Sequence, residues 1–209
     1  MLHARIHPWL STFSQGHRHH HSLTPIQIRS SDAGPGRIIL NQYPITEAHQ
    51  HEDATFPWYA MAAFWLVFSP VLIGAQLLLP DWPVLLGGAA SVAWSVYAYE
   101  VIHAVNHYRF EWWERATSHP RWGFLWKRIY GFHHFHHANI NTNEAISGFF
   151  GLPVADWVFR TYNQPPDLLL HGRVATAKMF HIRSPWPFVA WLDRWSRRRE
   201  ASLTRAGSR

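Results

Sequence analysis

Residues 58–80 read WYAMAAFWLVFSPVLIGAQLLLP and carry no charged side chain. At about 1.5 Å of rise per residue, a helix of this length spans a hydrocarbon layer of about 30 Å. A second apolar run follows a short, proline-rich turn and covers about residues 83–107. The two runs predict a transmembrane helical hairpin, with a kink in the first helix at Pro70. The alternative is a buried helical hairpin of a soluble protein.

The composition agrees with a protein that is partly dissolved in lipid. Aromatic residues make up 16% of the 209 residues, and charged residues make up only 15%, against roughly 25% in ordinary soluble domains. The length predicts a single domain over residues 1–209. The chain has no Cys, which excludes disulfides, zinc–thiolate sites, iron–sulfur clusters and a thiolate nucleophile.

The charge distribution predicts an orientation in the membrane. The net charge is +6, with a basic C-terminal tail over about residues 194–209. No basic stripe with interleaved stacking aromatic residues is present, so we expect no nucleic-acid partner and a tail that faces anionic lipid. Two crossings return the chain to its starting side, where every Lys and Arg lies. The positive-inside rule therefore places both termini and the histidine-rich segments on the cytoplasmic face of an integral membrane protein.

Histidine is the outstanding excess, with 17 residues, and imidazole is the commonest metal ligand. Each half of the chain contains an HxxxH spacing followed by HxxHH. The ten histidines in these boxes are His3, His7, His17, His20, His21, His103, His107, His133, His136 and His137. On a helix, positions i, i+3 and i+4 share one face, so each box presents its imidazoles in one direction.

Ten neutral imidazoles are too many for one metal ion of four to six ligands. Two ions with five histidines each would keep an open position, so the number of histidines predicts a binuclear site. Ligand type alone does not choose among iron, zinc, copper and nickel. The carboxylates expected to offset the charge of the ions are Glu100, Glu144 and Asp156.

Other histidines have ordinary interpretations. The run at residues 17–21 could instead be a tag or a basic surface patch. His19 and His134 lie off the triangular spacing and are expected in the outer shell or in solvent. The isolated histidines expected to be ordinary polar residues are His49, His51, His119, His171 and His181.

Two segments, YEVIHAVNH at residues 99–107 and HHFHHANINTNEAISGFFGLPVADWVFRTY at residues 133–162, resemble the fatty acid hydroxylase superfamily. That family includes sterol desaturases, ceramide fatty acyl 2-hydroxylases and carotenoid hydroxylases. The similarity covers most of the chain, from His3 to about Tyr162. The family's typical ending, an aspartate, an aromatic residue, Phe and Thr, is matched by Asp156, Trp157, Phe159 and Thr161.

The resemblance departs from the family's pattern at two places. Many members have glycine where Arg160 stands. Many also have membrane helices before the first box, so the chain start is open to truncation or misassignment. In that case His3 is the second histidine of its box, and His7 is not a ligand.

The resemblance implies a non-haem di-iron site on the cytosolic face, with two iron ions that zinc can replace in a purified sample. It also implies dioxygen as the oxidant and an external electron-transfer protein. We therefore expect an all-α integral membrane protein, in which a transmembrane helical hairpin carries a cytosolic helical cap with the histidine boxes. No catalytic residue beyond the metal ligands is expected.

The expected activity is hydroxylation or desaturation of a lipid C–H bond, with a fatty acyl chain as the first choice of substrate. The alternatives are a sterol or carotenoid substrate, a non-catalytic metal-binding or metal-transport membrane protein, and a catalytically dead remnant. The expected partners are the lipid substrate, the bilayer and the electron donor, and association into a homo-oligomer is left open.

Overall fold

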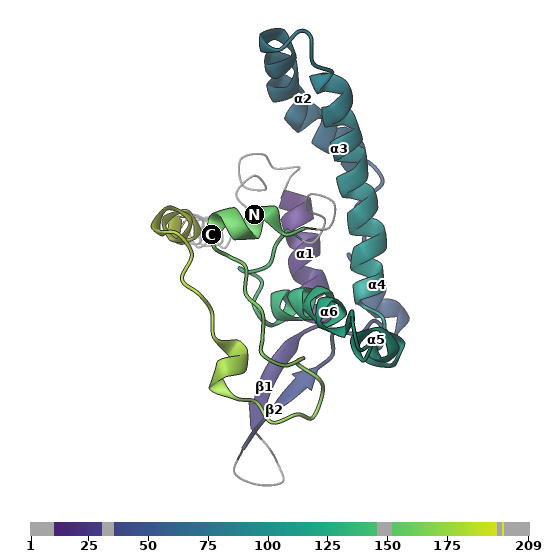
Figure 1. Cartoon of the computed structure of the whole chain (residues 1–209), viewed down its shortest axis with the longest axis vertical. Coiled ribbons are helices and arrows are strands. Elements are labelled where there is room, and N and C mark those ends of the chain that lie inside the picture. The colour runs from purple at the N-terminus through teal and green to yellow at the C-terminus, as the bar shows by residue number, and fades with distance from the viewer. Residues whose placement is uncertain (1–10, 31–35, 146–151, 196–197, 199–209) are drawn as a thin grey trace, which may run out of the picture.

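The structure, a computed structural model, describes residues 11–30, 36–145, 152–195 and 198. It is mostly helical, with 58% helix and 6% strand (Figure 1). The elements are α1 (Ser11–Leu23), β1 (Ile26–Ser30), β2 (Arg37–Asn41), η3 (Ala48–His51), α2 (Ala60–Leu78), α3 (Val84–Ala98), η4 (Tyr99–His103), α4 (Ala104–Asn106), α5 (Phe110–Thr117), α6 (Gly123–Ala138), α7 (Val154–Phe159) and η6 (Ala177–Phe180).

Helices α2 and α3 pack side by side and project from the rest of the protein (Figure 1). A Cβ on Gly88 would collide with the side chain of Leu72, so this glycine lets the two helices approach closely. Ala60–Leu78 and Val84–Asn106 are long and apolar enough to cross a membrane, and only 6% of each apolar window is buried. The core of a soluble protein would bury this surface, whereas here it is exposed.

The few polar side chains of α2 satisfy backbone groups of the helix pair. Pro70 lies inside α2 and cannot bond the carbonyl of Leu66, and the hydroxyl of Ser69 donates to that carbonyl at 3.2 Å. The amide of Gln76 donates to the carbonyl of Trp82 at 2.8 Å and accepts from the backbone nitrogen of Leu85 at 3.1 Å. In a membrane these bonds would supply hydrogen-bond partners that lipid does not offer.

The helix that starts with α3 changes its winding before it ends. It continues as the π-helix η4 and the short α4, and His107 caps its end. A π-helix has one extra residue per turn, and such segments are frequent at functional sites. The helical winding therefore changes in the segment that contains His103 and that precedes His107.

The prediction of an all-α protein is wrong at one place. Strands β1 and β2 pair antiparallel, with Ile26 opposite Asn41. Five-residue strands contain too few apolar positions to stand out from a loop by their periodicity. Side chains of the sheet, of α5, α6 and η6, and of two loops form the core, which consists of Ile26, Ile39, Tyr43, Trp113, Tyr130, Phe135, Leu169 and Met179.

Helix α7 ends at Arg160 in the left-handed conformation, with φ 59° and ψ 33°. This backbone is the one that glycine adopts at no steric cost. Arg160 therefore adopts a backbone conformation typical of glycine, at the position where many members of the family that the sequence resembles have glycine.

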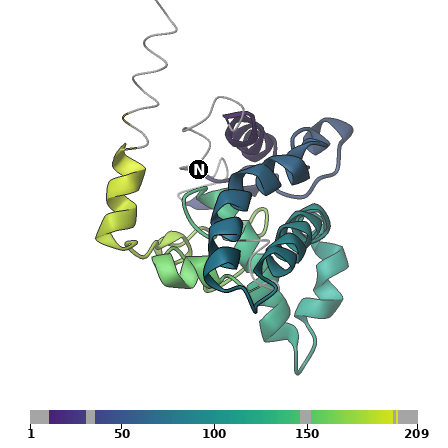
Figure 2. The same ribbon diagram turned by 90° about the horizontal axis from the view of Figure 1, so that it is seen from above.

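The C-terminal part of the described chain stands apart from the other helices. Residues 187–195 form a helix on the opposite side of the protein from α5 (Figure 2). Most of the predicted basic tail at about residues 194–209 lies outside the described residues.

Candidate metal centre

Three segments that are far apart in sequence bring their histidines together. They are α1, the helix end at η4 and α4, and the C-terminal half of α6. The structure gathers eight of the ten predicted histidines, namely His17, His20, His21, His103, His107, His133, His136 and His137. His3 and His7 lie outside the described residues.

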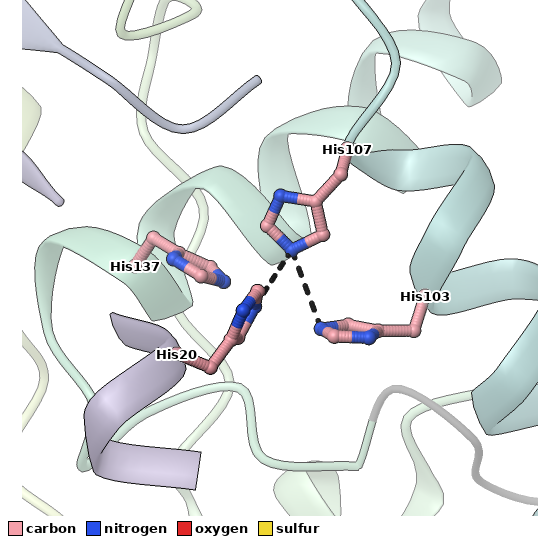
Figure 3. A group of neighbouring side chains, drawn as sticks. All are labelled: His20, His103, His107 and His137. Carbon is pink, nitrogen blue, oxygen red and sulfur yellow. Dashed lines mark hydrogen bonds between the residues drawn. The ribbon is translucent and has the colours of Figure 1, made fainter. Parts of the chain in front are cut away.

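The first group consists of four buried histidines, His20, His103, His107 and His137, whose ligand atoms all lie within 4.8 Å of one another (Figure 3). The Nε2 atom of His107 is 3.0 Å from that of His20 and 3.3 Å from that of His103. It is also 3.2 Å from the Nε2 atom of His133. His107 is thus the centre of this group.

The second group consists of His17, His21 and His136, and it is less deeply buried. The Nε2 atom of His136 lies 3.1 Å from that of His21 and 3.2 Å from that of His17. The two groups are neighbours, because the rings of His21 and His137 stack with their centres 4.0 Å apart.

Backbone carbonyls orient the rings from outside. The Nδ1 atom of His103 lies 2.9 Å from the carbonyl oxygen of Ala54, and that of His107 lies 2.7 Å from the carbonyl oxygen of Tyr43. A carbonyl only accepts, so each Nδ1 is the protonated nitrogen and each Nε2 carries a lone pair.

The same arrangement recurs on α6. The Nδ1 atom of His136 faces the carbonyl oxygen of Thr142 at 2.6 Å, and that of His137 faces the carbonyl oxygen of Thr24 at 2.9 Å. The Nε2 atom of His137 has no hydrogen-bond partner among the described residues. That nitrogen is therefore free to bind a cation.

This geometry is compatible with a bound metal ion. Two lone pairs that face each other at 3.3 Å, as in His103 and His107, repel unless a cation lies between them. Metal–nitrogen bonds of about 2.0–2.1 Å place two imidazole nitrogens of one ion about 2.8–3.4 Å apart, at octahedral or tetrahedral angles. The separations of 3.0–3.3 Å from the Nε2 atoms of His107 and His136 lie in this range, so the buried histidine groups are compatible with a metal ion.

Burial keeps the imidazoles uncharged near neutral pH. It is the main cause that lowers the pKa of His20 and of His136 from 6.5 to about 4, and electrostatic repulsion from His136 contributes to the shift of His20. The pKa of His17 falls to about 3, first through burial and then through His136. Neutral imidazole is the form that binds metal.

Two of the three predicted carboxylates, Glu100 and Asp156, hydrogen-bond to backbone groups beside the site, and the charge of Asp156 favours the protonated form of His136. Glu100 accepts a hydrogen bond from the backbone nitrogen of Phe56 at 2.7 Å. Buried Asp156 accepts from the backbone nitrogens of Glu144 and Ala145 and from the hydroxyl of Thr161. Both carboxylates brace the loops that supply the carbonyls facing His103 and His136, and no bond to an imidazole is seen in the described chain.

Histidines off the triangular spacing lie outside both groups. His19 is exposed and pairs with Asp53 at 2.9 Å. His134 is fully buried against Tyr43 and Tyr130, so the expectation that it could lie in solvent is wrong. The isolated histidines that lie at the surface, as expected, are His49, His51, His119, His171 and His181.

The sequence did not reveal the residues that orient the ligands. Ala54, Tyr43, Thr142 and Thr24 act through their backbone carbonyls, which any residue type supplies. Comparison of the chain with protein-family models, curated proteins and solved structures finds no match. The geometry of the histidine groups and the apolar helices beside them are therefore the features that indicate a function.

Proposed function

We propose that the chain is a membrane-bound, histidine-ligated di-metal oxygenase of the fatty acid hydroxylase and sterol desaturase type, which hydroxylates or desaturates a lipid C–H bond. The observation that carries the proposal is the pair His103 and His107. Their Nε2 lone pairs lie 3.3 Å apart, while both Nδ1 atoms face carbonyl oxygens. A cation between the two rings explains this arrangement.

One ion would be held by the first group of four histidines and the other by the second group of three. His133 lies beside the first group and is the next ligand, and His3 and His7 complete the predicted ten. When bound, two iron ions supply the activation of dioxygen, with electrons from an external electron-transfer protein. The chain itself keeps the imidazoles neutral and their rings fixed.

A fatty acyl chain suits the surroundings of the site. A groove of about 470 Å³ between α2 and α3 is lined by uncharged residues and ends at Phe56. The ring of Phe56 stacks on Tyr99 at 3.9 Å, and Tyr99 stacks on the imidazole of His103 at 4.6 Å. A chain in this groove reaches the neighbourhood of His103 without water, which avoids about 0.8 kcal/mol of exposure cost per CH₂.

The proposal assigns α2 and α3 to a transmembrane hairpin and the remaining elements to a cytosolic cap. Both termini and the histidine groups then lie on the cytoplasmic face, since the turn between α2 and α3 has no Lys or Arg.

Metal transport is less well supported. A transporter needs polar groups in mid-membrane that bind the passing ion. The polar side chains of α2, Ser69 and Gln76, are engaged with backbone groups of their own helix pair. A sterol or carotenoid remains the alternative substrate class, which product analysis by mass spectrometry separates from a fatty acyl chain.

The test is the metal content of detergent-purified protein from iron-supplemented cells. The variant changes His133, His136 and His137 to Ala, and the matched control changes the surface residues His49, His51 and His181 to Ala. If the wild type and the control contain nearly two irons per chain and the variant contains far less, the result supports the metal site and justifies a search for lipid products. If none of the samples contains a transition metal, the enzyme proposal is excluded.

A further inference from the structure

A line of contacting aromatic rings leads from the histidine groups to the surface. It begins at Tyr43, whose ring centre lies 4.4 Å from that of His107 and 4.9 Å from that of His137. The carbonyl of the same tyrosine faces Nδ1 of His107. Tyr43 is thus joined to the central histidine both through its ring and through its backbone.

The line continues through two buried rings to exposed ones. Tyr130 lies 5.9 Å from Tyr43, and Trp113 lies 5.1 Å from Tyr130, both measured between ring centres. Trp113 then contacts Trp112 at 5.1 Å and Trp126 at 6.1 Å. Trp112 is 56% exposed and Trp126 is 38% exposed, so the line ends in solvent-accessible indoles.

Packing alone does not explain the two tyrosines. The hydroxyls of Tyr43 and Tyr130 are buried and have no hydrogen-bond partner among the described residues. A buried hydroxyl without a partner destabilises the fold, and Phe would fill the same space without this cost. The phenol oxygen has an electronic effect that Phe lacks, because it makes the ring richer in electrons and easier to pass an electron through.

The same observation indicates which ring can hold a radical. An oxidised tyrosine loses its phenol proton, and no acceptor in the described chain is hydrogen-bonded to the phenol of Tyr43 or Tyr130. An oxidised tryptophan can keep its proton. The Nε1 proton of Trp113 is held by the carbonyl of Val105 at 3.2 Å.

We propose that Tyr43, Tyr130 and Trp113 form an electron-transfer relay between the histidine-bound metal centre and the surface, with Trp113 as its redox-active residue. The relay rests on the proposed function, which supplies the oxidised metal centre as the electron acceptor. One electron passes from the indole of Trp113, across the two phenol rings, to the oxidised centre. Trp113 would become a radical cation that keeps its Nε1 proton, and the oxidised metal centre would be the acceptor of its one electron.

A one-electron donor at the surface then restores Trp113. Its electron enters at Trp112 or Trp126, so no proton crosses the core. The relay thus gives an external electron-transfer protein a route to a metal centre that is itself buried.

The experiment uses the full chain, loaded with iron in detergent and oxidised with hydrogen peroxide without substrate or reductant. Samples are frozen at short times and examined by electron paramagnetic resonance, with deuterated tryptophan to identify the radical. The variants are Trp113→Phe and Tyr130→Phe. The matched control is Trp82→Phe, an exposed tryptophan in the turn between α2 and α3. Iron content is measured in every sample.

The relay predicts a tryptophan radical in the wild type and in Trp82→Phe. It also predicts that the radical is lost in Trp113→Phe and forms in lower yield in Tyr130→Phe. If Trp113→Phe fails to retain iron, Tyr130→Phe decides, because it removes only an unpartnered hydroxyl. An undiminished tryptophan signal in an iron-loaded variant overturns the relay, as does a wild type with iron and no tryptophan radical. A wild type without iron overturns both the relay and the proposed function, and metal content distinguishes these cases.

Discussion

The Nε2 atoms of His20 and His107 lie 3.0 Å apart, although 87 residues separate the two histidines in the chain. His20 is carried by α1, and His107 lies at the end of the helix that includes α3. A cation bound by both would cross-link the N-terminal helix to the apolar helix pair. Because the unfolded chain has no such preformed site, metal binding would stabilise the folded state.

Removal of metal should therefore lower the thermal stability of the protein. At a free-metal concentration of about 1,000 times Kd the stabilisation is about 4 kcal/mol, so a chelator should lower Tm by several degrees in detergent. His20→Ala should start from a lower Tm and respond less to the chelator. His181→Ala, at the surface, should behave as the wild type, and an equal chelator response in His20→Ala would contradict the cross-link.

The metal-free protein should lose stability as the pH falls. The pKa of His20 and of His136 lies at about 4 in the fold, and that of His17 at about 3, against 6.5 for the unfolded value. Between these values the unfolded chain binds more protons than the folded one, so stability is greatest above pH 6.5 and declines toward pH 4. Thermal unfolding from pH 8 to pH 4 checks this, and stability that rises on acidification would reject the buried neutral state.

Asp156→Ala should destabilise the protein and weaken metal binding. The substitution leaves two backbone nitrogens and the hydroxyl of Thr161 without their buried acceptor, at a cost of about 3 kcal/mol. The loop that supplies the Thr142 carbonyl to His136 loses its anchor, and we expect metal affinity to fall roughly 10–100-fold. Denaturant unfolding and metal titration measure the two effects, with Asp167→Ala as the exposed control. An unchanged metal affinity in Asp156→Ala would show that Asp156 does not support the metal site.

The chain should remain with the membrane fraction after an alkaline carbonate wash and need detergent for release. Leu66 is 67% exposed on α2, and Leu66→Arg places a charge on the lipid-facing surface at a cost of about 3 kcal/mol. We expect a lower membrane-inserted fraction for this variant. Leu152→Arg, an exposed position outside the two apolar helices, is the matched control. Release of the wild-type protein by the carbonate wash would favour the alternative of a buried helical hairpin in a soluble protein.

Much of the helical structure follows from local sequence. The uncharged run at residues 58–80 and the run at 83–107 appear as helices with nearly those bounds, because length and apolar composition are properties of the run itself. The HxxHH spacing also predicted helical faces correctly in α1 and α6. The helical repeat alone determines which side chains share a face.

Tertiary packing decides which of the histidine-bearing helix faces contact one another. The division of the histidines into a buried group of four and a shallower group of three depends on how α1, α6 and the end of the apolar helix meet. The π-helix at Tyr99–His103 and the carbonyls facing each Nδ1 depend on the same packing. Spacing along the chain reports only neighbours within a few residues, and a backbone carbonyl has no side-chain signature, so these features emerge only when distant segments come into contact.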